Sequence, residues 1–326
     1  MGSACENQIP TIDLSQSSGG DRDKVRGSPE WEKLCKKVKE ACENYGCFEV
    51  VYHNISMQVR DEFFSLMKQF FMLPLETKRK NCNPKPYHSY AGLSPLAPIY
   101  EGFGIEDVSN FDSLKGFAEQ LSWPLDDLDN LCKILSSMVK PLDELHRMIM
   151  MLIVDSYGLG EKMDSDSAIP SKTLLRMMKY RAPLPDENAT GLFAHTDKPL
   201  CTLLYEDHVS ALQLETKRGR WITFSPSSPS SYFFIVGDPL MAWSNGRLHA
   251  VKHRVIMKGD KDRYSIGAFR VPIEGSTIKP QQSLIDESHP QILKEFNYMD
   301  FFNFSATPEA MAMDSAKQVF AFAGIN

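Results

Sequence analysis

The stretch from Leu174 to Pro272 constrains the fold more than any other part of the chain. It consists of short runs of Leu, Ile, Val, Phe and Thr, alternating with polar residues or continuous. Clusters of turn-forming residues separate these runs, at 183–188, 217–219, 226–231 and 259–260. Many short strands divided by such turns are typical of an antiparallel barrel or sandwich. We therefore expect a β-rich core in the second half of the chain.

The residues around this core are predicted to be mainly helical. Apolar residues recur at helical spacing after Ser28, which can cap a helix, and again before Pro74, which must end one. The predicted helices are 29–45, 57–72, 125–157, 292–296 and 308–322. Short strands are expected at 9–14 and 48–52, and a long ordered loop at 81–110.

Composition excludes several classes of function. With 42% hydrophobic and 24% charged residues, the 326-residue chain can bury a substantial core. A net charge of −6 gives no general attraction to phosphate backbones, so nucleic acid is not an expected partner. The most apolar run, residues 148–154, is too short to cross a bilayer, and no membrane association is expected.

The seven cysteines are scattered and form no CxxC pair, which favours reduced thiols without a structural zinc. The first residues lack the apolar stretch of a signal peptide. Both observations favour a cytoplasmic protein.

His195 and Asp197 are a candidate metal-binding pair. Their spacing of two residues would place both side chains on one face of a strand. A third nitrogen ligand can come from a later strand, from either His249 or His253. These two histidines are four residues apart, so the alternation of a strand cannot distinguish between them.

Two histidines and one carboxylate on one face of a metal leave positions open for a chelating cosubstrate and O₂. This arrangement suits non-haem iron(II) oxygenases, whereas zinc usually takes a closed tetrahedron. An isolated His-x-Asp is more often a hydrogen-bonded pair than a metal site. Here it lies in a strand-rich segment together with a second polar pair, which favours the metal site.

That second pair is Arg263 and Ser265. A guanidinium and a hydroxyl two residues apart on a strand can clamp one carboxylate, the Arg in bidentate fashion. A dicarboxylate cosubstrate would fit, with its 2-oxo-acid end on the iron and its far carboxylate on this pair. Tyr180 can supply a further hydroxyl donor.

The motifs that carry these residues resemble those of the plant 2-oxoglutarate-dependent dioxygenases. The resemblance extends over nearly the whole chain, through the segments 9–13, 45–48, 195–197, 244–246, 253–255 and 263–265. In that family the distal metal ligand is the His of a His-Arg-Val triplet, which selects His253 and leaves His249 structural. The family's cosubstrate residues match Tyr180, Arg263 and Ser265.

The resemblance implies a mainly β fold with flanking helices, in which a double-stranded β-helix, or jelly roll, is wrapped by N-terminal and C-terminal helices. One compact unit is expected. Its parts would be an N-terminal region at 1–125, a supporting helix at 126–170, the jelly-roll core at 171–275 and a C-terminal helical lid at 276–326.

Within the family, the segments 178–181, 195–198 and 255–257 look most like the clade of glucosinolate side-chain modifying and steroidal-alkaloid hydroxylating dioxygenases. The implied cofactors are Fe(II), 2-oxoglutarate and O₂, with ascorbate as a supporting reductant. The implied reaction hydroxylates, desaturates or rearranges a small, largely apolar specialised metabolite and releases succinate and CO₂. The protein is expected to act on it as a monomer.

The resemblance also implies a substrate pocket. Its expected residues are Tyr100, Phe103, Met178, Lys198, Phe269, Phe301, Phe302 and Phe304. Met178 departs from the family pattern, because many members have Asn there, near the cosubstrate. Two alternatives remain open: an iron oxidase that does not use 2-oxoglutarate, and a catalytically silent barrel that binds a metabolite.

Overall fold

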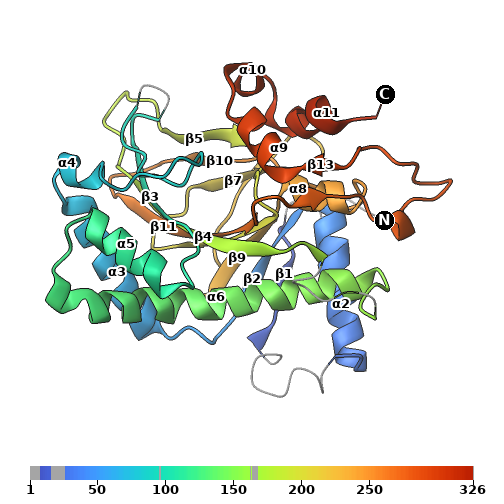
Figure 1. Cartoon of the computed structure of the whole chain (residues 1–326), viewed down its shortest axis with the longest axis horizontal. Helices are drawn as coiled ribbons and strands as arrows, with labels where there is room; N and C mark the ends of the chain where they lie inside the picture. The colour runs from blue at the N-terminus through green and yellow to red at the C-terminus, as the bar shows by residue number, and fades with distance from the viewer. Residues whose placement is uncertain (1–7, 16–25, 95–96, 162, 164–167, 326) are drawn as a thin grey trace.

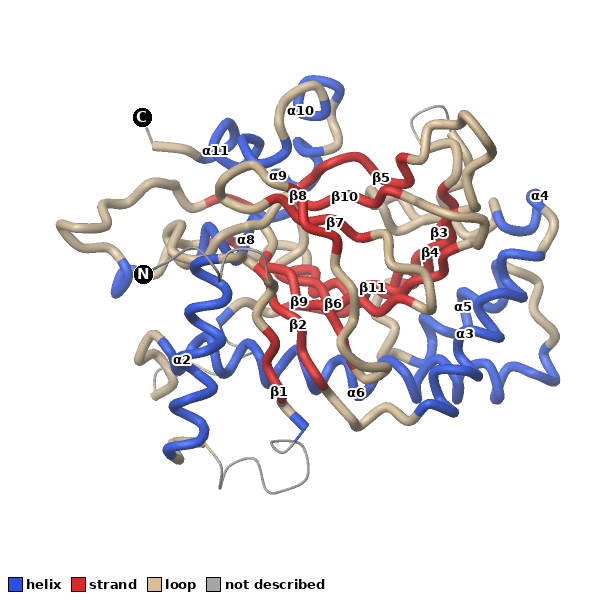
Figure 2. Tube along the Cα trace, turned by 180° about the vertical axis from the view of Figure 1, so that it is seen from behind, coloured by secondary structure: helices blue, strands red, loops and turns tan. Residues whose placement is uncertain are grey.

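A computed structural model describes residues 8–15, 26–94, 97–161, 163 and 168–325. Two facing sheets form the centre of the molecule, with helices around them (Figures 1 and 2). The large sheet has the strand order β1-β2-β9-β6-β11-β4-β3, and the small sheet has the order β5-β10-β7-β8. Apart from the parallel pair β1 and β2, all pairings in these sheets are antiparallel. The β-rich core predicted from the sequence is therefore confirmed.

The strands have the following bounds. They are β1 (Thr11–Asp13), β2 (Cys47–Val51), β3 (Tyr100–Ile105), β4 (Ser171–Tyr180), β5 (Thr190–His195), β6 (Cys201–Glu206), β7 (Leu212–Glu215), β8 (Trp221–Thr223), β9 (Ser231–Val236), β10 (His253–Ile256), β11 (Arg263–Pro272), β12 (Thr277–Ile278) and β13 (Phe296–Asn297). The last two form a separate two-stranded antiparallel sheet.

The helices have the following bounds. They are α2 (Pro29–Asn44), α3 (Met57–Met72), α4 (Leu75–Lys78), α5 (Phe111–Gln120), α6 (Leu128–Ser156), α8 (Asp238–Trp243), α9 (Tyr298–Ser305), α10 (Pro308–Met311) and α11 (Gln318–Ala323). No helix in the described ranges is long and apolar enough to span a membrane.

The predicted ends of the first two long helices are confirmed by their local chemistry. The Ser28 hydroxyl accepts a hydrogen bond from the backbone N–H of Trp31 at 3.2 Å, which caps α2. Helix α3 ends at Met72, and the next residue, Leu73, is extended with ψ 151°. Pro74 explains this ending, because the residue before a proline is disfavoured in helical conformation.

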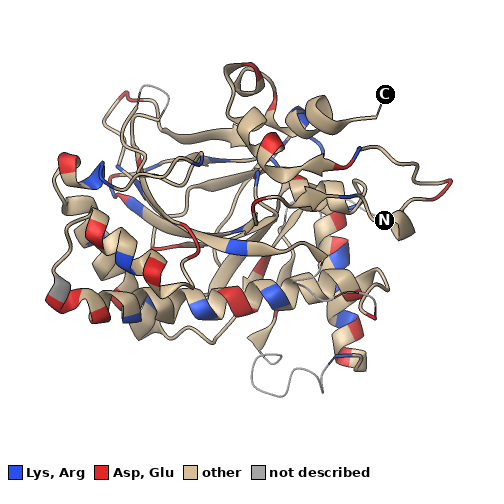
Figure 3. Cartoon of the chain, viewed as in Figure 1, with Lys and Arg blue, Asp and Glu red and all other residues tan. Residues whose placement is uncertain are grey.

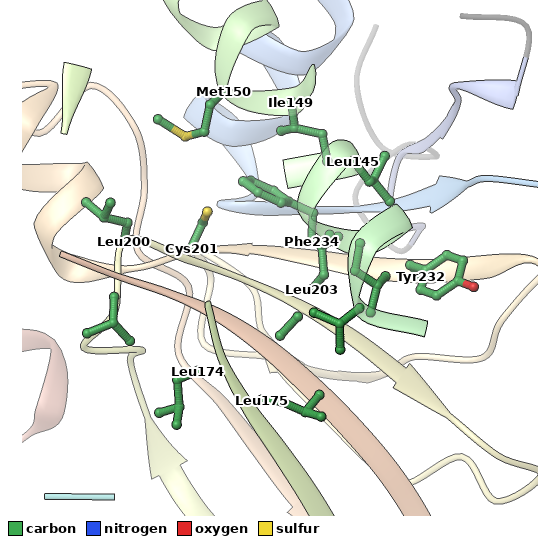
Figure 4. Packing of buried hydrophobic residues seen from close by; sticks show 14 of the residues in the cluster. Leu145, Ile149, Met150, Leu174, Leu175, Leu200, Cys201, Leu203, Tyr232 and Phe234 are labelled. Atoms are coloured by element: carbon green, nitrogen blue, oxygen red, sulfur yellow. The ribbon is translucent and has the colours of Figure 1, made fainter. Parts of the chain in front are cut away.

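Helix α6 packs along one face of the large sheet and buries one side of its length. Leu145 and Ile149 project from it towards Leu203 and Phe234 in the sheet (Figure 4). All four are essentially inaccessible to solvent. The charged positions of α6 and α2 are spaced along the helices, while the strands carry few of them (Figure 3). The opposite face of the large sheet is thereby left to face the small sheet.

Truncating this helix contact tests the packing. Leu145→Ala should lower the free energy of unfolding by about 2–5 kcal/mol, since a fully buried leucine leaves a cavity that close packing cannot refill. Chemical denaturation would measure the loss. Leu184→Ala is the matched control, because Leu184 is 65% exposed and should change stability by less than about 0.5 kcal/mol. Equal losses in both variants would contradict the assigned packing.

Several elements differ from the sequence predictions. The predicted loop at 81–110 contains strand β3, which pairs along β4 and completes the edge of the large sheet. The predicted helix at 292–296 is wrong, because this segment is irregular and leads into β13. Helices α5, α8 and α9 were not predicted from the sequence, and the helical segment at 308–322 is divided into shorter helices.

Candidate metal and cosubstrate site

The three side chains that the sequence predicts as metal ligands meet between the two sheets. His195 ends β5, His253 begins β10, and the two residues are directly paired across the small sheet. Each histidine Nε2 lies 3.6 Å from Asp197 Oδ1. The possible ligand atoms of all three residues lie within 4.8 Å of one another, and they form the one such His, Cys, Asp or Glu group found in the described ranges.

Both imidazoles are oriented for metal binding by their own backbone. His195 Nδ1 lies 2.8 Å from the carbonyl oxygen of Phe193, and His253 Nδ1 lies 3.3 Å from that of Val251. A carbonyl only accepts, so Nδ1 carries the proton and Nε2 keeps a free lone pair in each neutral ring. Two imidazole nitrogens and one carboxylate oxygen are the donor set of non-haem iron(II) oxygenases. The residues present therefore fit an iron(II) ion.

Asp197 does not lie on a strand, as the spacing argument assumed, but in the loop after β5. Its side chain is instead anchored by Thr202 of the facing sheet, whose hydroxyl donates a hydrogen bond of 2.6 Å to Asp197 Oδ2. Burial alone would raise the pKa of Asp197, but the neighbouring His253 and His195 together lower it to about 2. The carboxylate is thus ionised and has Oδ1 directed at the histidines.

The side chains differ in their access to solvent. The His195 side chain is 30% exposed, whereas those of His253 and Asp197 are about 5% exposed. Burial, with a smaller contribution from the neighbouring His195, lowers the pKa of His253 to about 4. The site therefore opens to solvent on the His195 side and keeps His253 neutral before any metal binds.

His249, the alternative ligand, belongs to the connection before β10. Its backbone N–H donates to the carbonyl of Cys42 near the end of α2, at 3.0 Å. It is not a member of the metal-ligating group. Burial lowers its pKa to about 4, with a smaller contribution from the Lys217 charge. Its position supports a structural role.

The depressed pKa of His249 predicts a pH dependence of stability. The unfolded chain binds a proton below about pH 6.5, but the folded chain resists that proton until about pH 4. Stability is therefore complete above pH 6.5 and is lost as the pH falls towards 4, at up to about 1.4 kcal/mol per pH unit for this group. In His249→Gln, the free energy of unfolding should fall less steeply with decreasing pH between 6.5 and 4, by the slope that uptake of about one proton contributes. Unfolding titrations at several pH values would measure this slope. An unchanged slope would contradict the assignment.

The predicted cosubstrate residues lie together on the inner face of the large sheet. Arg263 and Ser265 are both on β11, and Arg263 Nη1 donates to the Ser265 hydroxyl at 2.9 Å. Tyr180, at the end of β4, is directly opposite Arg263, and the guanidinium lies 5.1 Å from the centre of its ring. All three are at most 2% exposed. The geometry is that of a buried anion clamp.

Glu206 is a further member of this clamp, which the sequence motifs did not indicate. It lies on β6 directly opposite Ser265, and its Oε2 accepts from Arg263 Nε at 3.1 Å and from Nη2 at 2.9 Å. One edge of the guanidinium is therefore already neutralised. A ligand carboxylate would meet Nη1 and the end of the guanidinium, next to Ser265, rather than the edge that includes Nε.

Three of the predicted pocket residues lie on the same inner face. The centre of the Tyr100 ring lies 5.2 Å from that of the Tyr180 ring, and Met178 is directly opposite Ser265, with its sulfur 3.8 Å from the Tyr180 hydroxyl. The Phe269 ring covers Gly267, since a Cβ on that glycine would meet the ring at 2.4 Å. These side chains form the floor between the cosubstrate clamp and the metal ligands.

Phe103 does not join them. On β3 it is an odd number of residues from Tyr100, so it projects to the other face of the strand. There it packs in the helix-covered core against Phe70 and Phe71, and it is fully buried. Strand alternation therefore makes Phe103 a core residue rather than a pocket residue.

Lys198 is engaged in a buried network instead of facing an open pocket. Its ammonium donates to Asp238 Oδ2 at 2.6 Å, to the Thr196 hydroxyl at 3.0 Å and to Ser315 Oγ at 3.0 Å. The backbone N–H of Asp238 also donates to the carbonyl of Asp197 at 2.8 Å. This network holds the loop that carries Asp197 against α8 and the C-terminal segment, a role that the sequence did not indicate.

The predicted aromatic residues of the tail lie on α9. Phe301 and Phe302 are buried, and Phe304 is half-buried against Phe322. The Phe302 ring lies 5.7 Å from that of Tyr87, so the tail meets the loop before β3. Beside this contact is a cavity of about 320 Å³, lined by both apolar and charged residues that include Leu174, Met299 and His88. Tail and loop thus enclose space at the far end of β4 and β11.

Comparison with known protein families and structures assigns this arrangement. The family model of the 2OG-Fe(II) oxygenase superfamily matches residues 172–272, and the model described as non-haem dioxygenase in morphine synthesis N-terminal matches residues 9–110. The chain is 36% identical over 319 residues to the probable 2-oxoglutarate-dependent dioxygenase AOP1.2 of Arabidopsis thaliana. This alignment covers 96% of each protein. The chain belongs to the 2-oxoglutarate-dependent dioxygenase family.

Solved structures support the same conclusion for this dioxygenase. The dioxygenase for auxin oxidation 1 from Arabidopsis thaliana, in a binary complex with 2-oxoglutarate, superposes with a TM-score of 0.73 at 28% identity and covers 87% of this chain and 100% of its own. The rice dioxygenase for auxin oxidation gives a TM-score of 0.76 at 26% identity and covers 98% and 100%. The jelly-roll fold and the use of Fe(II), 2-oxoglutarate and O₂ are thus confirmed, and the two alternatives are not supported.

Proposed function

We propose that His195, Asp197 and His253 hold the iron, and that Tyr180, Arg263 and Ser265 bind the far carboxylate of 2-oxoglutarate. The observation that carries this proposal is the convergence of two free Nε2 lone pairs and one Asp197 oxygen opposite a buried anion clamp. A bound iron would activate O₂, so that one oxygen atom would enter succinate as 2-oxoglutarate loses CO₂ and the other would be inserted into a C–H bond of the substrate. The protein positions the reactants and excludes water.

The chain's own groups have separable tasks in this proposal. Thr202 fixes one oxygen of Asp197 and so directs the other at the metal. Arg263 orients the cosubstrate in a buried site, where its charge is only weakly screened. The loop before β3 and the tail on α9 close the far side and limit the access of water.

We propose further that the substrate is a small, largely apolar specialised metabolite that is hydroxylated, desaturated or rearranged. The support is the aromatic and aliphatic floor of Tyr100, Met178 and Phe269. The protein would act as a cytoplasmic monomer on a free small molecule; in support of a reducing compartment, the cysteines of the described residues are free thiols.

The test is an untargeted turnover experiment. Purified protein is incubated with an extract of the source tissue, Fe(II), ascorbate and 2-oxoglutarate, and mass spectrometry records product masses and succinate. The expected result is a metabolite that gains one oxygen or loses two hydrogens, in step with succinate. Turnover that continues at full rate without added 2-oxoglutarate would contradict the proposed role of Arg263 and Ser265.

A further inference from the structure

Arg176 is a buried cation without a counter-ion on the inner face of the large sheet. It is 7% exposed, and within the described ranges no carboxylate lies within ion-pair distance of it. Its hydrogen bonds are to neutral acceptors, the carbonyl of Tyr87 and the hydroxyl of Tyr100, the latter at 3.0 Å. The other buried arginine of this face, Arg263, is paired with Glu206. Burying an unpaired charge costs several kcal/mol, so such groups are usually completed by a partner.

The backbone around Arg176 is shaped to leave room for its charged end. Arg176 lies directly opposite Gly267 on β11 and Gly104 on β3. A Cβ on the nearby Gly102 would lie 2.4 Å from the Tyr100 hydroxyl and 2.9 Å from Arg176 Nη2. The two polar ends therefore occupy the space that a side chain on Gly102 would fill, above the inner face.

The position of Arg176 relative to the metal ligands suits a substrate group. Thr202, which holds Asp197, lies directly opposite Phe269, and Phe269 lies directly opposite Leu174 in the next strand. Arg176 is two strands and two residues from Thr202, so their Cα atoms are about 12 Å apart. A molecule with one carbon at the iron can thus reach Arg176 with a group several bonds away.

Bracing of the loop through Tyr87 does not explain these features fully. A neutral donor could satisfy a carbonyl and a hydroxyl without the cost of a buried charge. The nearby Lys172 shows the contrast, since it lies on the same strand and face but is 47% exposed and lies 3.4 Å from Asp107. What Arg176 lacks among the described residues is therefore a counter-ion.

From this geometry we infer that Arg176, with the Tyr100 hydroxyl beside it, binds a carboxylate of the substrate. This inference rests on the proposed function and narrows it: the substrate is an apolar carboxylic acid whose oxidised carbon lies several bonds from its carboxylate. The planar guanidinium favours a carboxylate over a neutral acceptor, because it can donate two parallel hydrogen bonds to it.

The test compares acids with their esters on the complete protein. A series of ω-phenylalkanoates, from phenylacetate to 6-phenylhexanoate, and their methyl esters is titrated by calorimetry into protein loaded anaerobically with Fe(II) and 2-oxoglutarate. At least one acid should bind at least about tenfold more tightly than its ester, which corresponds to 1.4 kcal/mol. A series in which no acid exceeds its ester overturns the inference, and this comparison needs no variant.

Variants then locate the preference. Arg176→Met should remove it by weakening acid binding at least about tenfold while leaving ester binding and 2-oxoglutarate binding within about threefold. Lys179→Met is the matched control and should keep the acid preference, because Lys179 lies on the same strand but projects to its other face, where it pairs with Asp262. An acid preference that persists in Arg176→Met overturns the assignment to this residue. Failure of 2-oxoglutarate itself to bind would instead refute the proposed function. The two failures are distinguishable, because the comparison of acids with their esters can be repeated on metal-free protein.

Discussion

His253→Ala should lose succinate formation by at least about a thousandfold, whereas His249→Gln should stay within about threefold of the unchanged protein. The metal supplies several kcal/mol of catalysis, and each 1.36 kcal/mol is a factor of ten in rate. His253 Nε2 is one of only two imidazole nitrogens beside Asp197 in the described site, so its removal leaves two ligands. Single-turnover assays for succinate would measure the loss.

The same pair of variants distinguishes loss of metal from loss of fold. Iron binding by His253→Ala should fall together with turnover, while thermal unfolding stays cooperative. Equilibrium dialysis under anaerobic conditions would measure the iron binding. His249→Gln should bind iron normally. Retained iron binding in His253→Ala, or its loss in His249→Gln, would contradict the choice between the two histidines.

Arg263→Met should weaken 2-oxoglutarate binding by at least about a hundredfold and lower the free energy of unfolding by about 3–5 kcal/mol. The first effect arises because the substitution removes the cationic partner of the cosubstrate carboxylate. The second arises because Glu206, whose side chain is 4% exposed, would keep its buried charge without a counter-ion. Calorimetric titration with 2-oxoglutarate and urea unfolding would measure the two effects separately.

Glu206→Gln provides the matched control. Its amide oxygen can still accept from Arg263 but carries no charge, so the free protein should lose some stability while the whole guanidinium charge becomes available to the cosubstrate. We expect 2-oxoglutarate to bind about tenfold more tightly. The double variant Arg263→Met with Glu206→Gln should recover part of the stability lost in Arg263→Met. Weaker cosubstrate binding in Glu206→Gln would mean that Glu206 chiefly orients Arg263 rather than moderating its charge.

Much of the site was predictable from the sequence because its chemistry is concentrated in short motifs. His195 and Asp197, and likewise Arg263 and Ser265, are two residues apart, and their side-chain types indicate a metal and a carboxylate. The alternation within Thr202 to Glu206 also held a signal. Thr202 and Glu206 are polar side chains on one face of an otherwise apolar strand. This pattern indicates the inner face of the sheet, but it forms no recognised motif.

The fold was predictable to a similar extent. Helices α2 and α3 have strong local signals, in Ser28 and Pro74, and form where the sequence predicts them. Strand β3 was missed because its sequence, Tyr-Glu-Gly-Phe-Gly-Ile, contains two glycines that weaken the strand pattern. Those glycines are explained only by the loop and side chains that approach them, since a Cβ on Gly104 would lie 2.4 Å from the carbonyl oxygen of His88.

The sequence by itself determined the composition of the core, the donor types at the metal and the family, because each depends on residue identity and short spacing. The tertiary structure decided which groups are partners. It placed His253 at the start of a strand facing His195 and left His249 in a loop against α2, a choice that only resemblance could make beforehand. It also paired Arg263 with Glu206, 57 residues away, and left Arg176 unpaired among the described residues. Such pairings depend on the register between strands distant in the chain, and no local pattern encodes that register.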